Sequence, residues 1–109
     1  MNVVDKIIAE RGVESKITPS DIALNIVSEF YFTAGEAVEA TYGVRKEELS
    51  VLTFCVLVLE NGFTVTGESA CASPANFDPV VGKTIAKQNA TQKIWQLMGY
   101  ELKSKLSGI

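Results

Sequence analysis

Cys71 is the side chain best suited to nucleophilic chemistry in this sequence. It stands among small residues ahead of a predicted helix start. A reactive thiolate needs a cation or a helix N-terminus to lower its pKa, and a base to accept its proton. The chain has no histidine, so the base of a thiol-dependent enzyme would have to be Glu68 or Asp78. The alternative, which we favour, is that Cys71 is a small buried side chain in the turn after a strand.

The two carboxylates also have structural explanations that need no catalysis. Asp78 precedes a proline at a helix start, where a carboxylate caps backbone N–H groups. Glu68 falls on the solvent side of a predicted strand. Two cysteines without histidine do not make a metal site. We therefore predict no catalytic residues, no metal and no cofactor.

A set of small polar side chains offers a ligand-binding patch instead of a catalytic centre. Tyr31 and Trp95 are aromatic residues that could flank it, although a tryptophan more often plugs a core. The candidate residues are Thr64, Thr66, Glu68, Ser69, Cys71 and Ser73.

The basic residues give a third, weaker possibility, a nucleic-acid binder. Lys83 and Lys87, with the lysines of the tail, could form a basic strip on the last helix. The net charge of -3 argues against a nucleic-acid footprint. A run of charges on a helix is usually a solvated face, so binding to nucleic acid is the least favoured function.

These residues are positioned by a predicted β-hairpin over residues 51–70. Val51–Leu59 is apolar and β-branched, Phe63–Ala70 alternates, and Asn61-Gly62 lies between them. Asn-Gly between two strand patterns favours a type I′ turn with a two-residue loop. That register places Glu60 opposite Phe63, Val58 opposite Val65, Val56 opposite Gly67, Cys55 opposite Glu68 and Leu52 opposite Cys71.

The same register divides the hairpin into two faces. The predicted core face carries Phe54, Val56, Val58, Phe63 and Val65. The other carries Thr53, Cys55, Leu57 and Leu59 beside Thr64, Thr66 and Glu68, and Cys55 and Cys71 point to opposite faces, so they cannot form a disulfide. A first strand that is apolar on both faces predicts a sheet covered on both sides. The second cover is either the N-terminal helices or another copy of the protein.

The rest of the chain reads as helices, with N-terminal ones over about residues 2–42. We predict a helix over Asn2–Arg11, and a second that Thr18 caps and that runs from Pro19 to about Glu29. Phe30–Thr33 fits either a short strand or a helix end, and Thr33 caps a short helix over Ala34–Thr41. Apolar residues at helical spacing predict a C-terminal helix over residues 79–98 that Gly99 ends, with strand character in 100–102.

Length and composition limit the class of protein. One hundred and nine residues predict a single domain, 1–109, and 47% hydrophobic with 21% charged residues is an ordinary globular balance. The N-terminus is amphipathic rather than a signal peptide, and no run is long and apolar enough for a membrane span. Free thiols fit a reducing compartment, so we expect a cytoplasmic protein.

Several segments together resemble a family of small tailed-phage and prophage proteins, typified by "gp forty-nine" of phage N4 and "gp sixty-six" of phage Sf6. The resemblance covers residues 50–102 closely and 17–33 more loosely. One departure is Gln96-Leu97-Met98, where many members are expected to have Pro-Leu-Glu; a proline at that position would stop the helix about a turn earlier. The segments that carry it are Leu52–Leu59, Asn61–Cys71, Asn76–Asp78, Gly82–Ala86, Lys93–Trp95 and Gly99-Tyr100. The resemblance implies a phage or prophage origin and a setting inside an infected bacterium; it implies no reaction and no site residues.

The sequence thus predicts an α+β fold: an antiparallel sheet built on the 51–70 hairpin, covered by the C-terminal helix and N-terminal helices. The leading functional hypothesis is a non-enzymatic accessory protein that binds a host protein or a small ligand as a homo-oligomer. The alternatives are the thiol enzyme at Cys71 and the nucleic-acid binder.

Overall fold

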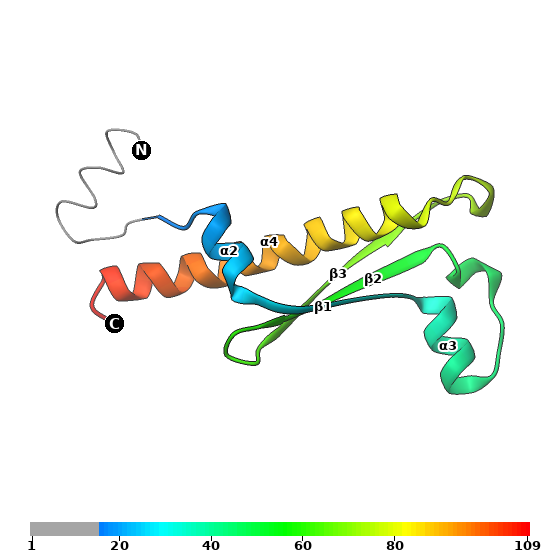
Figure 1. Ribbon diagram of the computed structural model, residues 1–109, viewed down its shortest axis with the longest axis horizontal. Coiled ribbons are helices and arrows are strands. Elements are labelled where there is room, and N and C mark those ends of the chain that lie inside the picture. Colours follow the sequence, from blue (N-terminus) through cyan, green and yellow to red (C-terminus); the bar gives the residue numbers. More distant parts are fainter. Residues whose placement is uncertain (1–15) are drawn as a thin grey trace.

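The computed structural model describes residues 16–109 as a three-stranded antiparallel sheet with one long helix across one face (Figure 1). The strand order is β1-β2-β3. The predicted α+β fold is confirmed, while the helix expected over Asn2–Arg11 lies outside the described residues. The elements are α2 (Pro19–Asn25), β1 (Ile26–Thr33), α3 (Ala34–Tyr42), β2 (Leu52–Leu59), β3 (Thr64–Ala70) and α4 (Pro79–Leu106), with 3-10 turns at Glu47–Leu49 and Pro74–Asn76.

Helix α2 starts as predicted but ends four residues early. Thr18 caps it in a capping box with Asp21, and Pro19 takes the first helical position. The expected end at Glu29 is wrong, because the β-branched and aromatic residues from Ile26 onward form strand β1. The N–H of Glu60 donates to both the backbone oxygen and Oδ1 of Asn25, at 3.0 Å each, which ties the helix end to the hairpin.

The hairpin is present, but its turn differs from the prediction. The Leu59 N–H donates to the Phe63 oxygen at 2.9 Å and the Gly62 N–H to the Leu59 oxygen at 2.9 Å, so the loop holds three residues, 60–62. Within this loop only Gly62 has a positive φ, 88°, so this is not the expected type I′ turn. It matches a three-residue hairpin loop in which a glycine in the left-handed region follows a type I turn.

One extra loop residue shifts the register by one, and this turns every β2 side chain to the opposite face. Cys55 lies opposite Gly67 and Leu57 opposite Val65. The core side of β2 therefore carries Cys55, Leu57 and Leu59. The predicted core face of this strand was wrong, although Val65 of β3 is buried as expected.

The two cysteines are free, as predicted, but not for the predicted reason. The Cys71 N–H donates to the Val51 oxygen, which places residue 71 opposite residue 51. Cys55 and Cys71 therefore fall on the same side of the pleat rather than on opposite sides. Four residues of strand, about 13 Å, separate their positions, which exceeds the reach of a disulfide.

Helix α4 begins as predicted and ends two turns later than predicted. Asp78 caps it and Pro79 opens it, but the helix continues through Gly99 to Leu106, so the expected strand character of 100–102 is also wrong. Gly108, at φ 76°, ends the helix instead, with its N–H donated to the Lys105 oxygen. The last turns of α4 project beyond the hairpin (Figure 1).

Small residues let α4 lie directly on the sheet. Gly82, Ala86, Ala90 and Ile94 are its buried residues. A side chain at Gly67 of β3 would overlap the Ala86 oxygen and the Ala90 nitrogen, both of them backbone atoms. Gly82, Ala86 and Ala90 are spaced four residues apart on the helix, and their small size permits this close packing on the sheet.

Gly67→Ala is expected to lower the free energy of unfolding by more than about 2 kcal/mol, since a rigid helix backbone cannot move aside for the added methyl. Gly99→Ala is the matched control: nothing lies within 4 Å of its new methyl, and it should raise stability by about 1 kcal/mol because alanine favours a helix. Urea unfolding of both variants measures this. Equal stability of the two would contradict the close helix–strand contact.

Candidate functional site

The predicted polar patch is divided between the two faces of the sheet. Thr64, Thr66 and Glu68 lie opposite Val58, Val56 and Phe54, on the face away from α4. Ser69 lies opposite Thr53, which is buried beneath α4. The remaining candidates follow the strand: the Cys71 thiol donates to the Ser73 carbonyl at 3.2 Å. The structure therefore does not gather these six residues into one patch.

The two aromatic residues expected near the patch lie elsewhere. Tyr31 is on β1, the edge strand on the far side of β2 from β3. Trp95 is half-buried and packs against the core cluster, which is the structural role that the sequence favoured.

The groups of the thiol hypothesis do not converge on Cys71. Asp78 Oδ1 accepts the Val80 and Val81 N–H groups at 2.9 and 3.5 Å, as a helix cap does. Glu68 points to the sheet face away from α4, and its backbone oxygen accepts Asn89 Nδ2 at 2.7 Å. The second thiol, Cys55, is fully buried, and burial raises its pKa, which keeps it protonated.

A cluster that sequence reasoning missed links the edge strand to α4. Lys87 Nζ lies 2.8 Å from Glu29 Oε2, and the Tyr31 hydroxyl donates to Glu29 Oε1 at 3.4 Å. Tyr31 also lies directly opposite Cys55 in the pairing of β1 with β2. Burial, then the charges of Cys55 and Glu29, raise the pKa of Tyr31 to about 12, so the phenol is a hydrogen-bond donor rather than a base at neutral pH. The sequence did not predict this cluster because its pattern placed Glu29 at the end of a helix, whereas Glu29 lies on strand β1 with Tyr31.

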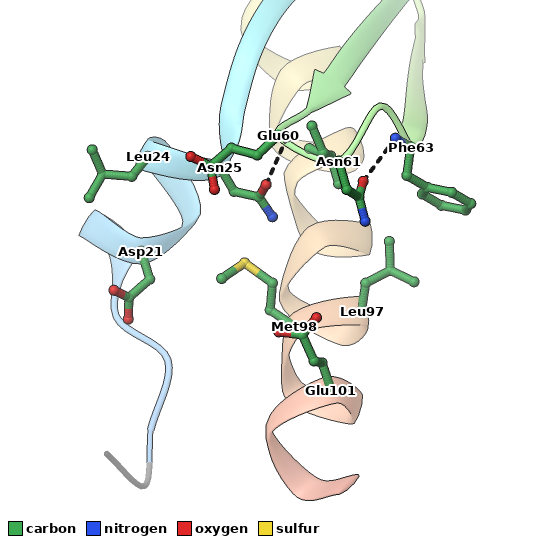
Figure 2. A pocket seen from close by; sticks show the side chains of 10 residues that line it. Asp21, Leu24, Asn25, Glu60, Asn61, Phe63, Leu97, Met98 and Glu101 are labelled. Carbon is green, nitrogen blue, oxygen red and sulfur yellow. Dashed lines mark hydrogen bonds between the residues drawn. The ribbon is translucent and has the colours of Figure 1, made fainter. Parts of the chain in front are cut away.

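A groove of about 680 Å³ lies at the hairpin tip, between α2, the turn and the C-terminal part of α4 (Figure 2). We call it the hairpin-tip groove. Its walls combine apolar side chains with carboxylates and amides. It is lined by Asp21, Leu24, Asn25, Leu59, Glu60, Asn61, Phe63, Leu97, Met98 and Glu101. The sequence could not reveal it, because the predicted helix ended before Glu101.

The sheet face away from α4 forms a second surface, which we call the open sheet face. Phe30 is 59% exposed and Phe32 37% exposed, and Phe54, Val56 and Val58 lie beside them on β2. The rings of Phe32 and Phe54 stack with centroids 5.7 Å apart. Figure 1 shows α4 on the other side of the sheet, with α2 and α3 at its two ends.

The lysines of α4 do not form one strip. Lys83 and Lys87 line a groove beside Tyr31, on the β1 side of the helix. Lys93 lines a groove on the β3 side with Thr64 and Thr66. Lys105 lies 3.4 Å from Glu101.

Alkaline pH is expected to destabilise the protein through Tyr31. Its pKa is raised in the fold from 10.0 to about 12, so the folded state holds its proton more tightly. The resulting stability is present below pH 10 and is lost as the pH rises toward 12. The raised pKa of Cys55 acts in the same direction.

Urea unfolding at several pH values measures this effect. Tyr31→Phe should lose less stability over this pH interval than the wild type. Tyr42→Phe, at an exposed tyrosine of α3, is the control and should lose as much stability as the wild type. A wild-type slope in Tyr31→Phe would contradict this.

Comparison with protein-family models identifies the family of this chain. The model of the Phage protein (N4 Gp49/phage Sf6 gene 66) family matches residues 17–106. Searches of curated proteins and of solved structures returned no match. Within residues 16–109, no helix combines the length and apolar character needed to cross a membrane. Since the family match spans α2, the whole sheet and α4 as far as Leu106, the chain belongs to the N4 Gp49/Sf6 gene 66 family of phage proteins.

Proposed function

We propose that this phage protein is a non-enzymatic accessory protein that binds a host protein or a small ligand as a homo-oligomer. It would act in the cytoplasm of the bacterial host, from a phage or a prophage. The observation that carries the proposal is the open sheet face. Three phenylalanines and two valines on one side of a sheet favour a partner, because water contact with such a patch is costly.

The distribution of apolar side chains supports a missing partner surface. In the described part of the chain, nine apolar residues are buried and fourteen large ones are exposed. The Cα radius of gyration is 18.4 Å, whereas a compact domain of this length has about 13 Å. An elongated chain with a small core gains stability when copies cover one another.

The open sheet face also bears on what covers the second side of the sheet, for which the sequence left two alternatives, the N-terminal helices or another copy of the protein. The two faces of β2 are exchanged relative to the prediction, but one apolar face of the sheet still lies away from α4. Phe30 and Phe32 remain exposed on it although α2 and α3 sit nearby. A second copy is therefore the cover that we propose for this face.

Phe30→Ser is expected to convert the oligomer into a monomer, because it replaces an exposed ring at the proposed interface by a hydroxyl. Native mass spectrometry of protein purified gently from bacterial cells measures the mass, and bound ligand would add to it. Val80→Ser, at an exposed apolar residue of α4, is the control and should keep the oligomer. A monomeric wild type would refute the oligomer, and dissociation of Val80→Ser instead would move the interface to α4.

The thiols are expected to be unreactive, in keeping with a binding protein. In the folded protein Cys71 should react slowly with iodoacetamide at neutral pH, and Cys55 only on unfolding, because Cys55 is fully buried. Mass spectrometry of the modified peptides measures both rates, with Cys71→Ser as the control. Alkylation of Cys71 much faster than that of a free cysteine would favour the thiol enzyme.

A further inference from the structure

We infer that the hairpin-tip groove binds a basic amphipathic helix of a partner protein. This inference rests on the proposed function, since it assumes a protein that works by binding, and it names the chemistry of the partner. The occupant would place an apolar stripe on the floor of the groove and lysine or arginine side chains along its rim.

The apolar part of the groove is exposed to solvent. Leu24 is 72% exposed, Phe63 56% and Leu97 42%, and they come from α2, the hairpin and α4 respectively. Met98 lies between them in Figure 2, and its unbranched side chain adapts to irregular surfaces. Exposed apolar residues from three elements around one hollow are typical of a surface that a partner covers.

The charged residues that the structure describes in this groove have a single sign. Among its described lining residues, Asp21, Glu60 and Glu101 are charged, and none is a lysine or arginine. Asp21 Oδ2 accepts the Thr18 N–H at 2.9 Å, which leaves its negative charge in place. The contact of Glu101 with Lys105 is long, 3.4 Å, and both side chains are largely exposed, so it neutralises little. A cationic partner complements this rim.

The shape and charge of the groove select among occupants. Two helices form its walls and the hairpin turn closes one end, as in grooves that hold an amphipathic helix (Figure 2). A second copy that docked through the same groove would bring three more carboxylates against these three, and like charges at an interface are repelled. A basic segment is therefore favoured over self-association at this site.

The test uses the full-length protein and a fluorescently labelled peptide with leucines at helical spacing and lysines on both flanks. Fluorescence anisotropy should show binding that weakens as salt is added. The double variant Glu60→Lys/Glu101→Lys should raise the Kd about tenfold or more, because attraction at the rim becomes repulsion. The milder pair Glu60→Gln/Glu101→Gln should give an intermediate Kd. Glu39→Lys, an exposed position on α3, is the matched control and should change the Kd less than about twofold.

Four outcomes would overturn the inference: no binding of the lysine peptide, equal binding of a peptide with glutamates in place of the lysines, equal weakening by Glu39→Lys, or a change of oligomer mass in the double variant, which would make the groove a contact between copies. Failure of the groove and failure of the oligomer are separable. A wild-type protein that is monomeric but binds the peptide would refute only the proposed oligomer. A wild-type oligomer that does not bind the peptide would refute only the inference about the groove.

Discussion

The backbone of α4 lies against the backbone of β3 at Gly67, and the rest of the structure depends on this contact. No other residue type fits there, because a side chain would occupy the space of Ala86 and Ala90 backbone atoms. The contact fixes the height of the helix above the sheet. At that height only small helix residues can face the strands, and Gly82, Ala86 and Ala90 supply them.

Close packing of this kind has a cost for the core. Glycine and alanine bury little apolar area, so the hydrophobic stabilisation depends mainly on the larger core residues, which are Ile22, Leu57, Leu59, Val65 and Ile94. The helix packs on β2 and β3, which leaves β1 linked to it chiefly through the Glu29–Lys87 pair. Several large apolar residues remain exposed, among them Phe30 and Phe32 on the open sheet face and Leu24, Phe63 and Leu97 in the hairpin-tip groove.

The parts of the fold that were predictable are those fixed by neighbouring residues. Thr18-Pro19 and Asp78-Pro79 mark helix starts through local hydrogen bonds, and both begin their helices as predicted. Asn61-Gly62 marks a turn, but its type depends on whether Glu60 joins the loop, and that single residue decides which face of β2 is buried. Gly99 is typical of a helix end, whereas in the structure the helix continues past it to Leu106 and stops just before Gly108.

The surfaces that we propose for binding could not be predicted from neighbouring residues, because they too depend on the strand register and the helix length. The open sheet face follows from the register, and the groove joins residues about eighty positions apart in the chain, from Asp21 to Glu101. The cluster at Tyr31 required a strand where a helix was expected. A sequence pattern can indicate which residues are apolar or acidic, but only the register and the helix length bring them together.

The projection of α4 beyond the hairpin gives the helix two parts of unequal local stability. The part over the sheet can open only with the core, whereas the last turns are held by their own hydrogen bonds and can unwind separately. The hairpin-tip groove spans the boundary between the two parts, at Leu97 and Glu101. A partner bound in the groove would hold the last turns of α4 in helical form. Its affinity would therefore depend on the helix propensity of α4 residues that it does not contact.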